Sequence, residues 1–171
     1  MLTNKKILIL AENIYEDLEL WYPKLRLIEE GAKVIAAGTG EKTYKGKNGY
    51  PLEADGDIKD YDAKDFDAVI VPGGFAPDKL RRHKEVLDFV KQMHDAGKVV
   101  AAICHGPWVL VSAGILKGKK VTCVSAIKDD VMNAGAQYSD REVVVDGNII
   151  TSRKPDDLPA FCREIIKALS K

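Results

Sequence analysis

Cys104 and His105 are the residues best suited to chemistry, because they lie between a predicted strand and a predicted helix. Residues 99–103, Val-Val-Ala-Ala-Ile, are small or apolar and predict a buried strand. A Gly-Pro pair follows His105, and the apolar run over residues 108–113 predicts a helix. This order places Cys104 on a sharp turn at a helix N-terminus, where the dipole and free N–H groups favour a thiolate. We therefore expect an easily ionised cysteine nucleophile at this position.

The alternative for any cysteine is inert burial, since free cysteine is among the most buried residue types. The strand, Cys-His-Gly-Pro and helix context favours reactivity at Cys104, whereas Cys123 and Cys162 have no such context and are expected to be packing residues. Three cysteines without a closely spaced pair indicate free thiols in a reducing compartment. We therefore expect a cytoplasmic protein.

A cysteine nucleophile needs partners that orient it and move its proton. Glu16 follows the first predicted strand, and its carboxyl can hydrogen-bond the sulfur if protonated but repels a thiolate if ionised. The alternative role for Glu16 is an acid in a helix first turn. His105 is a candidate general base, although a sharp turn directs its side chain away from that of Cys104. Asp78 is the first choice, and Glu85 the second, to orient the imidazole.

Other charged residues near Glu16 are expected to lie on the surface: Glu12, Asp17 and Glu19. Gly73 and Gly74 end another predicted strand, and without side chains they let a ligand approach the backbone. The N–H groups of Gly74 and His105 are candidates for an oxyanion hole. The alternative is a simple Pro-Gly-Gly turn.

No metal or cofactor is expected. The three histidines lack metal-ligand spacing with the cysteines, and no Gly-x-Gly-x-x-Gly follows the first strand. The stretch Gly40–Lys47 resembles a phosphate-binding loop only superficially, because the glycine spacing is wrong and Asn48 stands where Ser or Thr is needed.

Composition favours one globular domain over residues 1–171. The chain is 46% hydrophobic and 30% charged, and 26 basic residues balance 26 acidic ones. Zero net charge argues against nucleic acid or an anionic membrane as partner and makes self-association easier. No apolar run approaches the ~20 residues that span a bilayer, and the N-terminal residues lack a signal-peptide pattern.

Apolar patterns predict an alternation of strands and helices. Strands are expected at residues 6–11, 33–37, 66–71, 99–103 and 121–124, with a hairpin of 143–145 and 148–151 around Asp146-Gly147. Helices are expected at residues 18–28, 78–96, 108–113, 127–133 and from 154 to 169. Such alternation predicts an α/β fold with a mostly parallel sheet covered on both faces. Ligands bind such sheets beyond the carboxyl ends of the strands, where the segment after Ala11, Gly73-Gly74 and Cys104 should meet.

Motifs along nearly the whole chain resemble those of the ThiJ/PfpI superfamily, in its PfpI-like branch of intracellular proteases and deglycases. They are Tyr-Glu-Asp-Leu-Glu at 15–19, Lys-Gly-Lys-Asn-Gly at 45–49, Val-Pro-Gly-Gly-Phe-Ala-Pro-Asp at 71–78, Ala-Ile-Cys-His-Gly-Pro at 102–107 and Thr-Ser-Arg-Lys-Pro-Asp-Asp-Leu at 151–158. The resemblance implies a flavodoxin-like three-layer sandwich with a nucleophile elbow, assembled as a homodimer or homohexamer.

The resemblance also assigns roles. It implies Cys104 as nucleophile and Glu16 as its protonated partner. It implies that the acid behind His105 comes from a neighbouring subunit, where Asp78 stands in place of the usual, longer Glu. Trp108 occupies a position that is often Gln in the family, and with Gly73 it is expected to line the substrate pocket.

Four functional interpretations remain open. The first is an enzyme acting on glyoxal, methylglyoxal or their early adducts with proteins, of the glyoxalase III or deglycase type. The second is a cysteine peptidase acting on small peptides or unfolded chains. The third is a stress-protective redox sensor or chaperone in which Cys104 is oxidised, and a scaffold with a vestigial site is a fourth, duller option.

Overall fold

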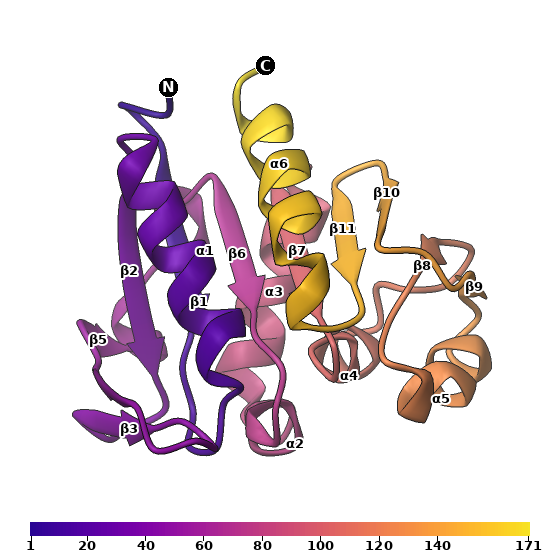
Figure 1. Cartoon of the computed structure of the whole chain (residues 1–171), viewed down its shortest axis with the longest axis horizontal. Coiled ribbons are helices and arrows are strands. Elements are labelled where there is room, and N and C mark those ends of the chain that lie inside the picture. The colour runs from indigo at the N-terminus through magenta and orange to yellow at the C-terminus, as the bar shows by residue number, and fades with distance from the viewer.

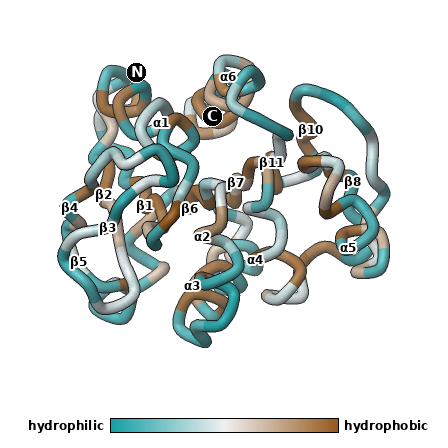
Figure 2. The backbone as a smooth tube through the Cα atoms, turned by 60° about the horizontal axis from the view of Figure 1, so that its bottom comes forward, coloured by the Kyte–Doolittle hydropathy of each residue, from teal (hydrophilic) through white to brown (hydrophobic).

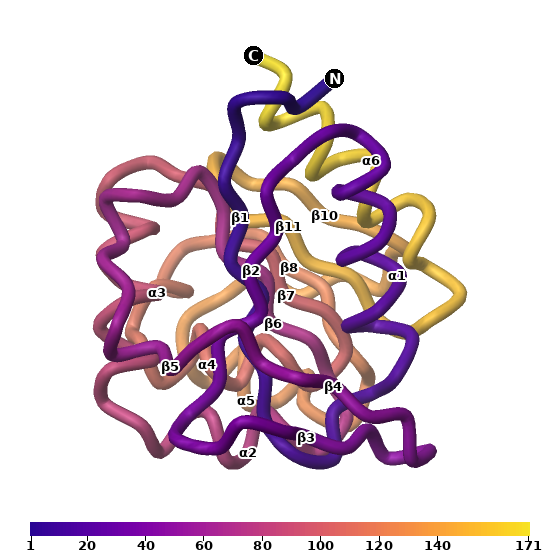
Figure 3. Tube along the Cα trace, turned by 90° about the vertical axis from the view of Figure 1, so that its left-hand side faces the viewer, coloured from indigo at the N-terminus to yellow at the C-terminus, as the bar shows by residue number.

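The computed structural model describes residues 1–171 and contains a seven-stranded sheet between two layers of helices (Figures 1 and 3). The strand order is β10-β11-β7-β6-β1-β2-β5, and all neighbours are parallel except β10 and β11. Strand bounds are β1 Lys6–Leu10, β2 Lys33–Gly38, β5 Gly56–Asp57, β6 Ala68–Val71, β7 Val99–Ile103, β10 Val143–Asp146 and β11 Ile149–Ser152. The predicted α/β sandwich with a mostly parallel sheet is confirmed.

The helices divide between the two faces of the sheet (Figure 3). One face carries α1 and α6, which pack on each other, and the opposite face carries α3 and α4. The bounds are α1 Asp17–Glu29, α2 Ala76–Leu80, α3 Lys84–Asp95, α4 Pro107–Ser112, α5 Lys128–Asn133 and α6 Leu158–Leu169. Two small sheets complete the fold: β3 Thr43–Lys45 with β4 Pro51–Glu53, and β8 Lys120–Val121 with β9 Gln137–Tyr138.

The central strands are apolar on both sides because helices cover both faces of the sheet. Every residue of β6 and β7 is buried, as the continuous apolar runs predict. In Figure 2 the hydrophobic colour gathers on the central strands, while α3 carries both colours and the outer loops are largely hydrophilic. The sheet is therefore a rigid base for the side chains at its carboxyl edge.

Two predicted elements differ from the structure. The helix expected over residues 78–96 is two helices, α2 and α3, separated by a turn in which His83 is extended. Leu80 and Val86 are both fully buried, but their spacing of six residues does not fit one continuous helix face. In place of the strand expected over 121–124 the structure has only the short β8. The chain then turns, and the N–H of Val124 donates to the carbonyl of Cys104 instead of to a neighbouring strand.

The two chain termini lie together at the end of the molecule opposite the carboxyl ends of the parallel strands (Figures 1 and 3). Beyond those carboxyl ends lie the segment after β1, the Pro-Gly-Gly turn after β6, and Cys104 after β7. The chain runs from β1 to β2 on one side of it and later crosses to β6 on the other side. The direction of strand order therefore reverses at β1, and ligands bind α/β sheets at the carboxyl end of such a reversal. No helix combines the length and the apolar character needed to cross a membrane.

Candidate active site

Cys104 occupies a sharp turn between β7 and α4. Its φ of +62° lies in the left-handed region, which is strained for a residue with a side chain. Its N–H donates to the carbonyl of Ser152 at 3.0 Å, and its own carbonyl accepts from Val124 at 3.2 Å. Such conformations cost about 1–3 kcal/mol and persist only where the surroundings fix them. The predicted elbow is present, and the half-buried thiol lies at the sheet edge.

The carboxyl beside this thiol belongs to Glu19 and not to Glu16. The Glu16 side chain caps α1, where one of its oxygens accepts from the N–H of Glu19 at 3.0 Å. Glu19 is one helical turn further on, is completely buried, and interacts with the Cys104 side chain. The structure therefore corrects the expectation for Glu16, whose alternative role at the start of the helix is the one observed, and the expectation that Glu19 and Glu12 are surface charges.

The error over Glu19 has a physical origin in α1. The helix carries apolar residues on two sides, and Leu18, Leu25 and Ile28, whose spacing marks the helix in the sequence, lie on its exposed side. The buried side consists of Glu19, Leu20, Pro23 and Leu27. Glu19 thus takes a buried position of α1 that an apolar residue would otherwise occupy, and it interacts there with the Cys104 side chain.

Gly73 fits between the Glu19 and Cys104 side chains. Its N–H donates to Oε2 of Glu19 at 2.8 Å. A Cβ atom on Gly73 would lie 2.3 Å from that oxygen and 2.6 Å from the Cβ of Cys104. Only glycine therefore allows the carboxyl and the thiol to approach each other here. The other oxygen of Glu19, Oε1, is buried without a hydrogen-bond partner, so it is free to carry a proton toward the sulfur.

Burial controls protonation of the Glu19–Cys104 pair. Burial, reinforced by the charge of Glu16, raises the pKa of Glu19 from 4.5 to about 8, so this carboxyl is protonated at neutral pH. Burial also raises the pKa of the Cys104 thiol, and an ionised Glu19 would raise it further. The expectation of an easily ionised thiol was therefore wrong, because burial outweighs the nearby N–H groups. Since protonated Glu19 does not repel a thiolate and can donate to it, the pair is suited to carrying one negative charge.

His105 contacts the thiol, although a side chain pointing away from Cys104 was expected on so sharp a turn. Its Nδ1 lies 3.4 Å from the sulfur. Burial and the charge of Lys47 lower the pKa of His105, so the ring is neutral at pH 7 and able to accept the thiol proton. Within one chain no carboxylate orients the ring. Asp78 pairs with Arg82, and Glu85 lies 3.6 Å from His83.

The backbone N–H groups of Gly74 and His105 lie near the Cys104 sulfur and lower its pKa. Gly74 has a φ of +78°, and a Cβ there would lie 2.5 Å from the backbone of Ile14 and Glu16. The backbone of the segment after β1 therefore packs directly against Gly74, and Tyr15 forms an antiparallel β-bridge with Gly74. Two donors aimed at one point is the geometry expected of an oxyanion hole.

Trp108 and Lys47 border the site. The Trp108 ring meets the His105 ring edge-on with centroids 5.1 Å apart, and its indole N–H donates to Asp130 at 2.9 Å. The exposed ammonium of Lys47 lowers the pKa of Glu19, Cys104 and His105 alike. The motif at residues 45–49 was noted in the sequence, but its place beside the thiol follows only from the fold. No cluster of three His, Cys, Asp or Glu side chains suited to a metal ion is present.

The sequence of this chain is similar to those of known proteins. Residues 5–168 match the sequence model described as the DJ-1/PfpI family. The deglycase PfpI of Pyrococcus furiosus is 46% identical over 164 residues, which cover 96% of this chain and 99% of that protein. Protein/nucleic acid deglycase 2 of Escherichia coli is 43% identical over 169 residues, 97% of this chain and 98% of that protein.

A solved structure resembles this chain as closely. It is the crystal structure of a two-domain protein of Anabaena variabilis with DJ-1/ThiJ/PfpI-like and ferritin-like domains, which is 47% identical and superimposes with a TM-score of 0.94. The match covers 97% of this chain and 48% of that one, so this chain spans about half its length. Sequence and fold agree, and the chain belongs to the DJ-1/PfpI family.

Proposed function

We propose that this protein is a cysteine-dependent enzyme of the deglycase and glyoxalase III type, acting on glyoxal, methylglyoxal or their early adducts with proteins. The observation that carries the proposal is the buried, protonated carboxyl of Glu19 beside Cys104, with neutral His105 at 3.4 Å from the sulfur. The names of the two deglycase relatives support the same substrate class.

The chemistry follows from these positions. The sulfur of Cys104 forms a bond to the aldehyde carbon while His105 Nδ1 takes the thiol proton, and the N–H groups of Gly74 and His105 hold the oxyanion. A proton then moves from the former aldehyde carbon to the adjacent carbonyl carbon through an enediol, with Glu19 or His105 as acid and base. This oxidises one carbon and reduces its neighbour without an external oxidant. Water hydrolyses the resulting thioester to a 2-hydroxy acid and regenerates the thiol.

The direct test is lactate formation from methylglyoxal by the wild type and by Cys104→Ser. Cys162→Ser is the matched control, because Cys162 is a buried cysteine in α6, whereas Cys123 directly precedes Val124, whose N–H donates to the Cys104 carbonyl. We expect no lactate from Cys104→Ser and undiminished formation by Cys162→Ser. Lactate from Cys104→Ser at the wild-type rate would reject Cys104 as nucleophile.

A cysteine peptidase is the second candidate, favoured by the contact between the Cys104 thiol and the His105 imidazole. A fluorescent peptide assayed in parallel separates the two functions. Peptide cleavage without lactate would favour the peptidase, and neither activity would favour oxidation of Cys104 as a sensor or chaperone device.

We further propose a homodimer or homohexamer in which Asp78 reaches His105 of a neighbouring subunit. The exposed apolar side chains of α1, among them Leu18 at 57% and Leu25 at 58% exposure, support association. Asp78, paired with Arg82 and 46% exposed in its side chain, is accessible to a neighbour. Mixing Asp78→Ala and Cys104→Ser subunits should restore part of the activity, and failure of mixed oligomers to complement would count against a shared site.

A further inference from the structure

The backbone of Cys104 is held by two separate segments. The carbonyl of Ser152, at the end of β11, accepts the Cys104 N–H at 3.0 Å. The N–H of Val124, in the segment after β8, donates to the Cys104 carbonyl at 3.2 Å. Because the left-handed conformation of Cys104 is strained, it depends on both segments staying in place.

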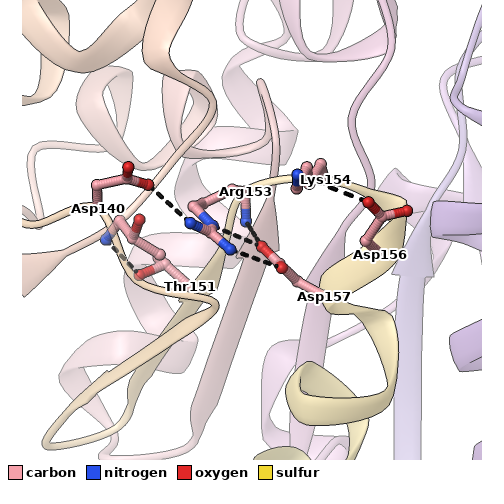
Figure 4. Close-up of polar contacts among 7 residues, drawn as sticks. Asp140, Thr151, Arg153, Lys154, Asp156 and Asp157 are labelled. Atoms are coloured by element: carbon pink, nitrogen blue, oxygen red, sulfur yellow. Dashed lines mark hydrogen bonds and ion pairs between the residues drawn. The ribbon is translucent and has the colours of Figure 1, made fainter.

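One guanidinium links the end of β11 to Asp140, which follows β9, and to Asp157 at the start of α6 (Figure 4). Arg153 follows Ser152 directly, and it binds Asp157 with its own N–H at 3.1 Å and with Nε and Nη2 at 2.9 and 3.0 Å. Its Nη1 reaches Asp140 at 2.8 Å. Asp157 is almost fully buried at the start of α6, whereas Asp140 is largely exposed.

Asp140 leads back to the second segment. Its neighbour Ser139 donates a backbone N–H to the carbonyl of Val121 at 3.0 Å, and the chain continues from Val121, where β8 ends, to Val124. A second link runs from the N–H of Thr122 to the buried hydroxyl of Thr151 at 2.9 Å. The charged groups thus connect, through Ser139 and Val121, the two segments that end in the Ser152 carbonyl and the Val124 N–H, which both bind the Cys104 backbone.

We propose that Arg153, with Asp140 and Asp157, forms a positioning cluster that fixes the backbone of the nucleophile. None of the three side chains is bonded to the thiol, so the cluster acts through the peptide of Cys104. Without it, the Thr122–Thr151 hydrogen bond still links the two segments, but they separate more readily and Cys104 relaxes toward ordinary negative φ. The sulfur then leaves the N–H groups of Gly74 and His105 that favour its thiolate.

Two variants test the proposal and one serves as control. Arg153→Lys keeps the charge but loses the forked contact with Asp157, and Asp140→Ala removes only the exposed arm, so it retains the buried contacts needed for folding. The control is Asp156→Ala, whose side chain is 82% exposed and pairs with Lys154 at 3.6 Å beside the cluster.

The measurements address the thiol and its backbone directly. The inference rests on the proposed role of Cys104, but alkylation by iodoacetamide and amide hydrogen exchange require no substrate. In Arg153→Lys we expect alkylation of Cys104 at pH 8 to slow about fivefold or more. Exchange of the Cys104 and Val124 amides should accelerate about tenfold, while amides of the central strand β1 keep their wild-type rates. Asp140→Ala should change both quantities in the same direction by less, and Asp156→Ala should match the wild type.

Two results would overturn the proposal. One is unchanged or faster alkylation of Cys104 in Asp140→Ala and in folded Arg153→Lys. The other is exchange that accelerates equally at Cys104 and in β1, because the cluster would then stabilise the whole fold without positioning the nucleophile. If Arg153→Lys does not fold, Asp140→Ala alone decides. Absence of lactate formation by the wild type would refute the proposed substrate and leave this result unaffected.

Discussion

Replacing Glu19 with glutamine should remove a pH dependence of stability that the buried carboxyl imposes on the wild type. Glu19 is fully buried, and its pKa rises from 4.5 to about 8 on folding. Between these two values the folded state keeps a proton that the unfolded state has lost. The free energy of unfolding of the wild type therefore falls as the pH rises through this window, and it stops falling above it.

The size of this effect follows from the same values. At about 1.4 kcal/mol per pH unit, a rise from 4.5 to about 8 corresponds to at most about 5 kcal/mol. The amide introduced by Glu19→Gln would be neutral at every pH and would retain an oxygen for the N–H of Gly73. The variant should therefore gain stability relative to the wild type by up to about this amount between pH 4.5 and 8.

Urea unfolding of both proteins at pH 5, 6, 7 and 8, at one protein concentration, measures the difference. Other titrating groups are common to both proteins and cancel. The expected result is a stability difference that grows steadily with pH in favour of Glu19→Gln. Two parallel curves would refute the argument, since they would mean that Glu19 titrates alike in the folded and unfolded states.

Other changes at the site have defined outcomes. Gly73→Ala should lower lactate formation at least about tenfold by pushing the Glu19 carboxyl and the thiol apart, whereas Gly97→Asn, where the added Cβ meets open space, should leave activity near wild type in the same assay. Lys47→Gln should raise the pKa of Cys104, Glu19 and His105 together, because the charge of Lys47 lowers all three. Alkylation of Cys104 at pH 7.5 should therefore slow in Lys47→Gln and keep the wild-type rate in Lys47→Arg. Equal rates in all three proteins would contradict this. Because burial lowers the pKa of His105, the acidic fall in the rate of lactate formation should lie below pH 6.5, and a midpoint above that value would exclude His105 as the base. Trp108→Phe should cost about 1 kcal/mol or less in urea unfolding through loss of the exposed bond to Asp130, and a larger loss would show that the ring also supports the turn.

The arrangement of layers could be predicted from the sequence because it depends on patterns that single segments contain. Residues 99–103 are apolar without interruption, as a strand covered on both faces requires. The Asp146-Gly147 pair indicates the β10–β11 hairpin, in which Gly147 adopts a φ of +59°. The left-handed turn at Cys104 follows from a strand that must meet a helix within three residues.

The identity of the carboxyl partner could not be predicted in the same way. Glu16 and Glu19 are one helical turn apart, and which of them faces the sheet depends on how α1 is rotated about its axis. The exposed apolar residues Leu18 and Leu25 mask that rotation in the sequence. The raised pKa of Cys104 likewise depends on burial at the sheet edge, which only the assembled fold determines.

The position of the chain ends has a consequence for how this domain can be combined with others. Both ends emerge at the pole opposite the reactive thiol, so a second folded unit or an affinity tag joined to either end leaves the entrance to Cys104 open. The Anabaena protein, in which a similar domain shares one chain with a ferritin-like domain, is a natural fusion of this kind. Linkers attached here extend away from the reactive thiol, which makes the domain a suitable module for joining to a second folded unit.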